Sequence, residues 1–476
     1  MLTDNKVVMI IKWIAREIKI FYVGGFVRDH LLGVKSKDVD LEVYGISFKD
    51  LEKKLKKFFG AKRVNSIGRS FNVLHISLDN GFNLDVSIPR RDSKINVGHR
   101  GIKAEADICL SMKEAARRRD FTINAMLMNP LTGEIFDFYG GQKDLKNKIL
   151  RAVDSQTFVE DPLRALRAAQ FASRFGLTVE PQTEKLIKKM VATGAMEELS
   201  VERIRDELDK LLLKSAKPSV GLQLLADWGI IERVFPEFGR LSLCEQEPAW
   251  HPEGDVWEHT KLAVNTMAKL IRKNKWPLSE SRLAMLATLF HDIGKPDATR
   301  EIKGKIRAIG HAEVGEKITK QTLKRLKCPN ELTSQICSIV REHRYPPSLF
   351  KKLKTKEISN RRYVGEISAL LNRLKNVPIE IFLAVCEADY RGKELTGSFW
   401  LGKEMIKIIK KYHLDGRPLL FGRDVLSVFS RLGFGILDGR LIGNLLRKVE
   451  EYRRLGEILT KTEAKKFLEK VIKKIS

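Results

Sequence analysis

Residues 24–45 read GGFVRDHLLGVKSKDVDLEVYG, and this stretch decides the fold of the N-terminal part. Its glycine pair lets backbone N–H groups approach a phosphate closely, and Arg28 follows the pair. Asp38 and Asp40 are two residues apart on an expected strand, so their carboxylates point to the same face. There they can hold a hard divalent cation such as Mg²⁺, which prefers oxygen ligands. The combination is typical of enzymes that transfer phosphoryl or nucleotidyl groups.

Two runs with alternating apolar and polar residues, 38–44 and 82–88, predict half-buried strands with one polar face. A two-metal centre for in-line displacement needs a further acidic ligand. Asp85 is the best candidate, because it lies on the polar face of the second run. Glu42 has the same phase as the first two carboxylates but lies further from the turn, so it is the alternative.

The overall charge favours a polyanionic partner. The 476 residues contain 87 Lys and Arg against 60 Asp and Glu, a formal net charge of +27. Such a surplus indicates nucleic acid rather than a membrane, although a basic surface that only keeps the protein in solution is an alternative. No run reaches the roughly 18 uninterrupted apolar residues of a membrane-spanning helix. The five cysteines form no C-x-x-C pair, which indicates reduced thiols and a cytoplasmic location.

The order of the sequence patterns predicts an α+β multidomain chain. Strand and helix signals alternate in residues 1–148, which should form a head with a mixed sheet. Beyond the head, helical patterns continue to the C-terminus, and a polar stretch with prolines marks a boundary near residues 240–255. We expect four parts: the head (1–148), a helical neck (149–245), a helical domain (246–395) and a basic helical tail (396–476).

The stretch EDPLRALRAAQFASRFG, residues 160–176, predicts a helix that ends at Gly176 and carries a base-selecting pair. Asp161 and Arg164 are three residues apart and so share one face. An aspartate offers only acceptors and an arginine only donors, which matches the amino donor and ring acceptor of both cytosine and adenine. Uracil and guanine would leave buried groups unpaired, at about 1–3 kcal/mol per group. The alternative is a capping acid with an ordinary i,i+3 ion pair.

Further motifs make the chain resemble the tRNA nucleotidyltransferase and bacterial poly(A) polymerase family, within the DNA polymerase beta superfamily. They are RRDFTINAM (118–126), DFYGGQKDL (137–145), EDPLRALRA (160–168) and VERIRDEL (201–208). The resemblance implies a polymerase-beta-like head in which Asp38 and Asp40 carry Mg²⁺ and Asp85 helps to activate the RNA 3′-hydroxyl. It also implies a nucleotide site made of Gly24, Gly25, Arg28, Arg119, Asp120, Asn124, Asp161, Arg164 and Arg167. Gln170 departs from the family, which commonly has an arginine at that position.

A second constellation lies in the C-terminal half, where LATLFHDIGKP places His291 beside Asp292 after an apolar helical run. With His259 upstream and Asp389 downstream, the imidazoles and carboxylates form a set suited to a divalent transition metal. The ordered set resembles the HD phosphohydrolase superfamily, and a metal there would activate water against a phosphate ester. Two further histidines are candidates, as contacts to a substrate phosphate or as structural residues: His311 and His343.

The combination of this head with an HD phosphohydrolase domain at 246–395 resembles the bacterial multifunctional CCA-adding enzymes. The resemblance implies template-independent addition of C, C and A to tRNA 3′ ends from CTP and ATP. It also implies phosphatase or 2′,3′-cyclic phosphodiesterase activity at the HD metal, whose identity stays open. The expected partners are tRNA, CTP and ATP, with the basic neck and tail contacting RNA phosphates; no protein partner is indicated. Alternatives are CC-only or A-only addition, poly(A) synthesis, and an HD phosphohydrolase whose head only binds RNA.

Overall fold

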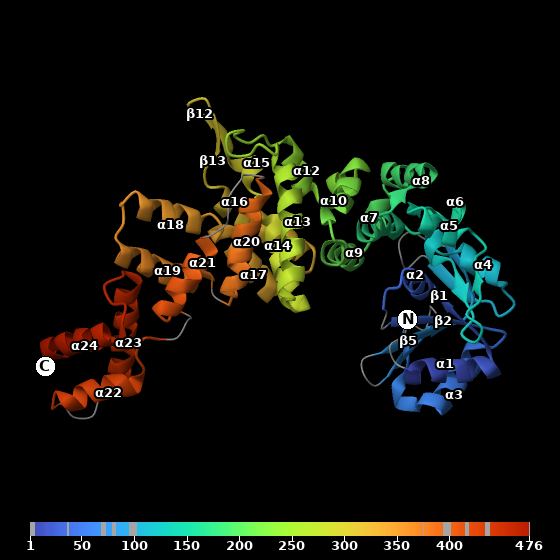
Figure 1. Ribbon diagram of the computed structural model, residues 1–476, viewed down its shortest axis with the longest axis horizontal. Helices are drawn as coiled ribbons and strands as arrows, with labels where there is room; N and C mark the ends of the chain where they lie inside the picture. The colour runs from blue at the N-terminus through green and yellow to red at the C-terminus, as the bar shows by residue number, and fades with distance from the viewer. Residues whose placement is uncertain are drawn as a thin grey trace. The chain divides into compact units, whose positions relative to one another are not determined.

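The chain divides into two units, Met1–Phe235 and Pro236–Ser476, whose elements are labelled in Figure 1. The structure is a computed structural model, and it describes residues 5–35, 38–67, 73–78, 82–94, 102–374, 376–393, 401–414, 418–433 and 438–475. Within these residues no helix is both long and apolar enough to cross a membrane. The finer division into four parts stays a prediction.

A mixed sheet with strand order β3-β4-β5-β2-β1-β8-β9 forms the centre of the head. β2 (Asp38–Tyr44) and β5 (Asn83–Ser87) are its parallel pair, and the other neighbouring strands run antiparallel. The register of the parallel pair places Asp40 opposite Asp85. The α+β class with a mixed sheet is therefore confirmed, and both alternating runs form strands. The remaining strands of the sheet are β1 (Lys19–Val23), β3 (Val64–Ile67), β4 (Val73–Ser77), β8 (Leu127–Met128) and β9 (Ile135–Phe136).

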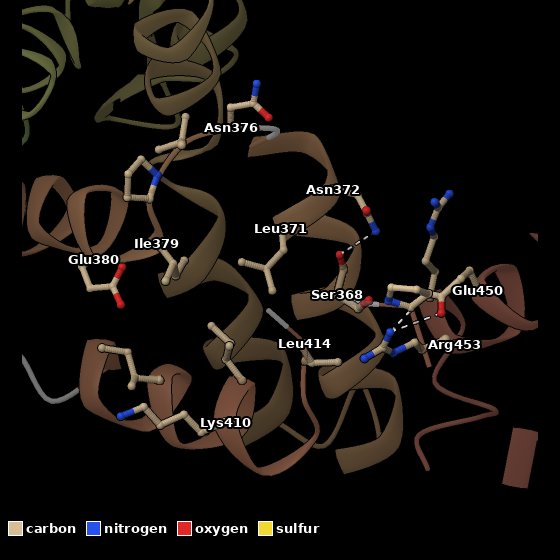
Figure 2. Close-up of a pocket in the computed structure, with 16 residues that line it drawn as sticks. Ser368, Leu371, Asn372, Asn376, Ile379, Glu380, Lys410, Leu414, Glu450 and Arg453 are labelled. Atoms are coloured by element: carbon tan, nitrogen blue, oxygen red, sulfur yellow. Dashed lines mark hydrogen bonds and ion pairs between the residues drawn. The ribbon is translucent and has the colours of Figure 1, made fainter. Parts of the chain in front are cut away.

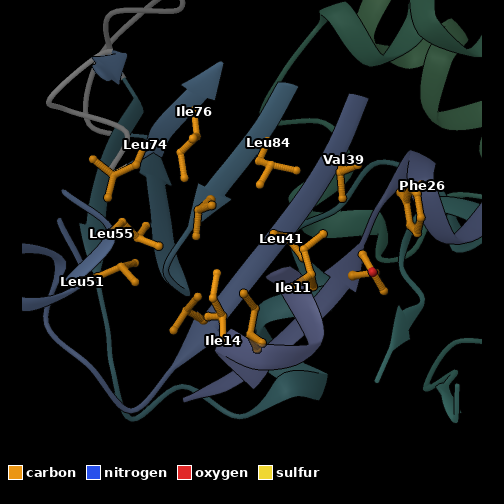
Figure 3. Close-up of a cluster of buried hydrophobic side chains, with 14 of the residues drawn as sticks. Ile11, Ile14, Phe26, Val39, Leu41, Leu51, Leu55, Leu74, Ile76 and Leu84 are labelled. Atoms are coloured by element: carbon orange, nitrogen blue, oxygen red, sulfur yellow. The ribbon is translucent and has the colours of Figure 1, made fainter. Parts of the chain in front are cut away.

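The core of the head explains why the carboxylates share the opposite face of the sheet. Two helices cover one face, α1 (Asn5–Glu17) and α3 (Phe48–Phe59). Val39 and Leu41 of β2 point into this core with Ile11 and Leu51 of the two helices, each at most 1% exposed (Figure 3). Burying a large aliphatic side chain contributes about 1.5–3 kcal/mol. Because strand side chains alternate, the same packing turns the polar residues of β2 away from the core.

Short elements complete the head, and one of them begins at the glycine pair. α2 (Gly25–Leu31) begins directly at the second glycine, and its N-cap residue Gly24 has a φ of +65°. The others are η1 (Ala61–Arg63), β6 (Arg90–Lys94), β7 (Ile102–Ala106), α4 (Met112–Arg117), η5 (Thr122–Asn124), α5 (Gly141–Lys146) and β10 (Ile149–Leu150).

Helices follow the head in the same unit. α7 (Leu163–Phe175) ends as predicted at Gly176, which adopts the left-handed conformation with a φ of +65°. α7 packs closely on α10 (Pro218–Asp227), since a Cβ added at Gly221 would lie 2.9 Å from the carbonyl oxygen of Ala169. The remaining elements are α6 (Ser155–Phe158), β11 (Thr178–Val179), α8 (Pro181–Ala192), η6 (Ala195–Glu198), α9 (Val201–Lys214) and α11 (Ile230–Val234).

The second unit begins with a helical domain. Its long helices are α13 (Val256–Asn274), α14 (Leu278–Phe290), α16 (His311–Arg325), α17 (Asn330–Glu342), α18 (Tyr345–Lys354), α19 (Asn360–Leu374) and α20 (Ile379–Gly392). Shorter helical turns are α12 (Pro236–Gly239), η7 (Arg240–Leu243) and α15 (Lys295–Ala298).

The expectation of helices alone beyond residue 255 is wrong at one hairpin. β12 (Thr299–Ile302) pairs antiparallel with β13 (Lys305–Ala308). Lys303 and Gly304 between them have φ values of +53° and +70°. Two consecutive residues with positive φ are what a tight hairpin turn requires, and glycine adopts that conformation without strain. The Lys-Gly pair between two β-branched segments is the local signal for this turn.

The basic tail consists of helices α21 (Leu401–Lys411), α22 (Gly422–Arg431), α23 (Gly439–Arg454) and α24 (Lys461–Ile475). α22, α23 and α24 share an apolar core that includes Val425, Leu445 and Leu468. A cavity of about 740 Å³ lies where α19 and α20 meet α21 and α23 (Figure 2). Its lining includes an ion pair between Glu450 and Arg453 at 3.2 Å. This cavity therefore belongs to the junction between the helical domain and the tail.

Two candidate active sites

A pocket of about 420 Å³ in the N-terminal unit gathers every residue predicted for nucleotide binding. Its lining combines residues from the glycine turn, from the 118–126 motif, from α7 and from α9. The predicted residues that line it are Gly24, Gly25, Arg28, Arg119, Asp120, Asn124, Asp161, Arg164 and Arg167, together with the predicted metal ligand Asp40. Five segments distant in sequence thus converge on one pocket.

The first glycine of the pair is needed for a close approach. A Cβ added at Gly24 would lie 2.9 Å from Nη1 of Arg119 and 3.4 Å from Oδ2 of Asp40. The positive φ of this residue also disfavours any other side chain. The backbone at Gly24 therefore lies close to both the guanidinium of Arg119 and the carboxylate of Asp40.

The predicted metal carboxylates lie on the adjacent strands β2 and β5. Burial, opposed by the charge of Arg119 and reinforced by the nearby carboxylates of Asp85 and Asp38, raises the pKa of Asp40 to about 6. Asp85 Oδ1 lies 2.6 Å from Nδ1 of His75 on β4. Among the described residues, the groups of three or more ligand atoms within 4.8 Å of one another all belong to the second unit. A divalent cation would offset the electrostatic repulsion among the carboxylates of Asp38, Asp40 and Asp85.

Glu42, the alternative third ligand, has a different set of partners. Its carboxylate is 1% exposed and pairs with Nη2 of Arg118 at 3.1 Å and with Nη2 of Arg119 at 3.4 Å. The hydroxyl of Tyr44 donates to it at 2.6 Å. This geometry makes Glu42 an anchor for the arginines, which favours Asp85 over Glu42 as the third acid.

A chain of polar contacts fixes the floor of the pocket. Nη1 of Arg28 donates to Oδ1 of Asn124 at 2.6 Å, and Nδ2 of Asn124 donates to Oδ1 of Asp120 at 3.0 Å. Nε of Arg167 donates to the other oxygen of Asp120 at 2.8 Å. Although burial opposes it, the Arg167 guanidinium holds the pKa of Asp120 below its usual value. Asp120 and Asn124 therefore brace two arginines that line the pocket.

The predicted base-selecting pair lies on one wall. Nη2 of Arg203 on α9 pairs with Oδ2 of Asp161 at 2.8 Å. Nη1 and Nη2 of Arg164 each donate at 2.6 Å, to the carbonyl oxygens of Thr157 and Arg118. The side chains of Asp161 and Arg164 thus share the pocket, each oriented by a third group. Arg203 was missed at the sequence level, although it lies inside the VERIRDEL motif, because nothing local indicates its distant partner.

Other residues in this pocket were also missed. Three further cations line it: Arg174, Lys210 and Lys214. Burial, together with the neighbouring Arg174, lowers the pKa of Lys214. Gln170 lines the pocket at 2% exposure, and its Nε2 has no hydrogen-bond partner among the residues that the structure describes. The lining holds seven basic and three acidic residues, which suits a polyanion such as a triphosphate.

A second site forms in the helical domain from His259 on α13, His291 and Asp292 after α14, and Asp389 on α20. Nε2 of His259 lies 3.1 Å from Nε2 of His291 and 3.3 Å from Oδ1 of Asp389. Nε2 of His291 lies 3.2 Å from Oδ2 of Asp292. All four residues are buried, and one ligand atom from each lies within 4.8 Å of the others. Two imidazoles and two carboxylates at this spacing can hold a divalent metal.

The other ring nitrogens of these histidines are bound to acceptors. Nδ1 of His291 lies 2.7 Å from the carbonyl oxygen of Thr288, and Nδ1 of His259 lies 2.7 Å from Oε1 of Glu253. Glu253 also contacts Nδ1 of His251 at 2.8 Å. Such partners fix the tautomer and leave Nε2 available for a metal. Glu253 and His251 were missed, because carboxylates that orient histidines have no fixed spacing in sequence.

His311 and His343 lie beside the same cluster. Their Nε2 atoms are 3.4 Å and 3.6 Å from Oδ1 of Asp292. Burial lowers the pKa of His311 to about 4 and also lowers the pKa of His343, so both rings are neutral at neutral pH.

A pocket of about 280 Å³ adjoins this cluster and is lined by His311, Lys295 and Arg344. Trp250 and Ile309 also line it, and they are 67% and 69% exposed. Basic side chains and an exposed aromatic ring beside a group of candidate metal ligands suit a phosphate ester that carries a base.

The fold and the two sites together define a class of protein: a polymerase-type nucleotidyltransferase head joined to an HD domain. Family models match the chain in the same order. The Poly A polymerase head domain matches residues 20–151, and the HD domain matches residues 256–374. Between them, residues 176–241 match the probable RNA and SrmB-binding site of polymerase A. Asp389 lies beyond the matched HD residues, but α20 brings it to the cluster.

Known relatives narrow the class. The Multifunctional CCA protein of Shewanella denitrificans is 34% identical over 437 residues, which cover 88% of this chain and 97% of that protein. A solved CCA-adding enzyme in complex with ATP has a TM-score of 0.63 at 23% identity, covering 99% of this chain and 95% of the other. The Thermotoga maritima CCA-adding enzyme complexed with tRNA has a TM-score of 0.61 at 22% identity, covering 100% and 97%. The chain belongs to the multifunctional CCA protein family, which confirms the resemblance seen in its motifs.

Proposed function

We propose that this protein adds C, C and A to the 3′ ends of tRNA from CTP and ATP and hydrolyses phosphate esters at its HD centre. The observation that best supports nucleotide addition is that all predicted nucleotide-binding residues line one cationic pocket together with Asp40. Membership of the CCA family supports the choice of tRNA as acceptor. The net charge of +27 supports an RNA substrate that is bound largely through its phosphates. Five cysteines that form no disulfide within the described residues fit the cytoplasmic location that we propose.

Each group in the head has a proposed role. Mg²⁺ bound by Asp38 and Asp40 would supply charge neutralisation for the triphosphate. Asp85 would help to deprotonate the RNA 3′-hydroxyl, which attacks the α-phosphorus while the bond to pyrophosphate breaks. Arg28 and Arg119 would hold the triphosphate through charged N–H groups.

Asp161 and Arg164 would select the base. The remaining acceptor capacity of Asp161 suits the amino group of cytosine or adenine, and a donor of Arg164 suits the adjacent ring nitrogen. The protein would thereby select nucleotides without a template.

The buried group of two histidines and two aspartates supports the proposed hydrolysis of phosphate esters. A divalent metal held by His259, His291, Asp292 and Asp389 would supply a water of lowered pKa. In hydrolysis of a 2′,3′-cyclic phosphate, water attacks phosphorus and the bond to one ribose oxygen breaks. The proton lost by water ends on that oxygen. Lys295 and Arg344 in the adjoining pocket would hold the phosphate. His311 and His343, whose Nε2 atoms lie 3.4 Å and 3.6 Å from Oδ1 of Asp292, are proposed as further contacts to the substrate phosphate.

The test of the first activity uses tRNA transcripts that end before CCA, after C and after CC, each incubated with one labelled nucleotide. The proposal expects incorporation of C, C and A in order, and then termination. Long A tracts would indicate a poly(A) polymerase, while a stop at CC or a requirement for CC would restrict the enzyme to part of the reaction.

Two variants test the separation of the activities. Asp40→Ala should abolish incorporation and leave hydrolysis of 2′,3′-cyclic AMP intact, and His291→Ala should do the reverse. Asp227→Ala and His413→Asn are matched controls outside both sites and should change neither rate. Loss of both activities in Asp40→Ala would contradict a two-site enzyme.

A further inference from the structure

We propose that a groove between α1 and α3 of the head is a docking surface for an acidic amphipathic helix of a partner protein. The groove has a volume of about 540 Å³, and side chains from both helices line it. Neither proposed activity uses these side chains, so the inference goes beyond the proposed function.

Large apolar side chains that the fold leaves exposed meet at this groove. Trp13 of α1 and Phe58 of α3 line it and are 46% and 38% exposed. Their rings contact each other, with centroids 3.7 Å apart, so they form one surface across the two helices. Met9 lies four residues before Trp13 and is 69% exposed, which extends this surface along α1. Contiguous exposed apolar surface of this kind is typical of sites that bind another protein.

The groove has a buried apolar floor and a length that suits a helix. Ile14 and Leu55 also line it, and both belong to the core of the head at 4% and 2% exposure (Figure 3). α1 and α3 have 13 and 12 residues, so each is about 18–20 Å long. An amphipathic helix binds such a groove by inserting apolar side chains that are three or four residues apart.

The charges around the groove favour an acidic partner. Lys54 and Lys57 line it and are exposed, and Glu17 is the one acidic residue among the described residues of the lining. The same two helices expose three further cations: Lys12, Arg16 and Lys53. A helix with Asp and Glu beside its apolar face would complement these cations, which steers association and fixes the orientation of the partner.

The same features argue against two other occupants. A second copy of this chain would bring the lysines of both copies together, and each copy carries a net charge of +27. An RNA base needs an aromatic face that is open to stacking, whereas the rings of Trp13 and Phe58 pack against each other.

The groove also lies on the far side of the sheet from the nucleotide pocket. α1 and α3 cover the face into which Val39 and Leu41 point, and Asp40 between them points to the opposite face. A partner helix in the groove would therefore leave the nucleotide pocket open. It would hold the enzyme beside another protein without blocking nucleotide addition.

The test measures binding of a synthetic peptide to the full-length protein by fluorescence anisotropy. The labelled peptide is a helix about as long as α1, with Leu and Phe along one face and Glu elsewhere. Trp13→Ser and the double variant Lys54→Glu/Lys57→Glu should each raise its Kd about tenfold or more. Lys185→Glu/Lys189→Glu, the same charge change on exposed positions of α8, is the matched control and should bind nearly as well as the unchanged protein.

A charge exchange makes the test specific. A second peptide with Lys in place of Glu should bind Lys54→Glu/Lys57→Glu more tightly than it binds the unchanged protein. Nucleotide addition and thermal unfolding of Trp13→Ser and of the double variant should be unchanged, because these side chains are exposed and lie outside both active sites. Saturating peptide should not raise the KM for CTP.

Several outcomes would overturn the proposal. Equal affinity for a scrambled peptide of the same composition would show general attraction to a basic protein, and undiminished binding by Trp13→Ser would exclude the groove. Competition of the peptide with CTP would place it in the nucleotide pocket. A single-stranded RNA oligonucleotide that loses affinity in these variants, with no peptide binding, would make the groove an RNA site. A dimer in sedimentation that dissociates in Trp13→Ser would make a second copy the occupant.

Discussion

At the scale of single residues, the N-terminal unit orients its proposed base-selecting residues, Asp161 and Arg164, through partners that lie elsewhere in the fold. Arg203 binds Oδ2 of Asp161, and the amide N–H of Leu163 donates to Oδ1 at 3.1 Å. The carboxylate is thus oriented before a nucleotide arrives. An oriented acceptor loses less conformational entropy on binding, which strengthens its discrimination between bases.

Asp161→Ala should relax nucleotide choice. Without its acceptor, the pocket loses the preference for an amino group, and UTP and GTP should be incorporated. A lost interaction of about 1–3 kcal/mol corresponds to roughly a 5- to 150-fold fall in the ratio of kcat/KM for CTP over UTP. Asp227→Ala, which removes an exposed carboxylate of α10, is the control. Unchanged selectivity in Asp161→Ala would refute the base-reading role.

Gln170→Leu should weaken nucleotide binding without lowering the stability of the fold. The buried Nε2 of Gln170 has no hydrogen-bond partner within the described parts of the chain, so we expect a bound nucleotide to accept its hydrogen bond. The variant should unfold at the same or a higher urea concentration, because an unsatisfied buried group is removed. Its KM for CTP and ATP should rise by about fivefold or more, as expected for a lost hydrogen bond of about 1 kcal/mol or more. If stability and nucleotide affinity fall together, Gln170 has a packing role instead.

At the scale of elements, the sequence predicts local structure better than it predicts partners. The alternation in residues 38–44 and 82–88 identifies β2 and β5, because a period of two depends only on neighbouring residues. Their parallel pairing, which brings Asp40 opposite Asp85, could not be read from either run, since it depends on long-range packing. Arg203 and Glu253 were missed for the same reason.

In the HD site, too, the sequence indicates the local motif but not the distances between residues that lie far apart in the chain. The four residues in the order His, His-Asp, Asp mark the cluster, while the distances that bring His311 and His343 to Asp292 depend on how α16 and α17 pack. The hairpin β12–β13 was missed for a different reason. Its turn residues, Lys303 and Gly304, are adjacent in the sequence, so this element could have been predicted from local sequence alone.

Gly294→Ala tests the packing that positions this cluster. A Cβ there would lie 2.2 Å from the carbonyl oxygen of His311 and 2.4 Å from the backbone nitrogen of Gly315. Backbone atoms cannot move aside as a flexible side chain can, so α16 should shift away from Asp292 at a cost of about 1–3 kcal/mol or more. Hydrolysis and metal affinity should fall while nucleotide addition persists. Gly439→Ala is the control, since its Cβ would meet nothing within 4 Å and its φ is not positive. Equal metal content in both variants would contradict this packing argument.

At the scale of the whole molecule, the two chemical centres lie in separate compact units. Among the described residues, those that line the pocket around Asp40 all belong to Met1–Phe235, and the candidate metal ligands His259, His291, Asp292 and Asp389 all belong to Pro236–Ser476. Each ligand should therefore stabilise the unit that binds it. A ligand present at about 100 times its Kd adds about 2.7 kcal/mol to the stability of the state that binds it.

Removal of the metal and binding of CTP should consequently change the melting temperatures of different unfolding transitions. In calorimetry, loading with Mn²⁺ should raise the transition of the C-terminal unit by about 5–10 °C, since 1 kcal/mol shifts Tm by about 2–4 °C for a domain of this size. Chelation should reverse that rise, and His291→Ala should be insensitive to both treatments. CTP with Mg²⁺ should instead raise the transition of the N-terminal unit, and this response should be lost in Asp40→Ala. A single transition that responds to either ligand would show that the units unfold together, because binding energy supplied at one centre would then also stabilise the other.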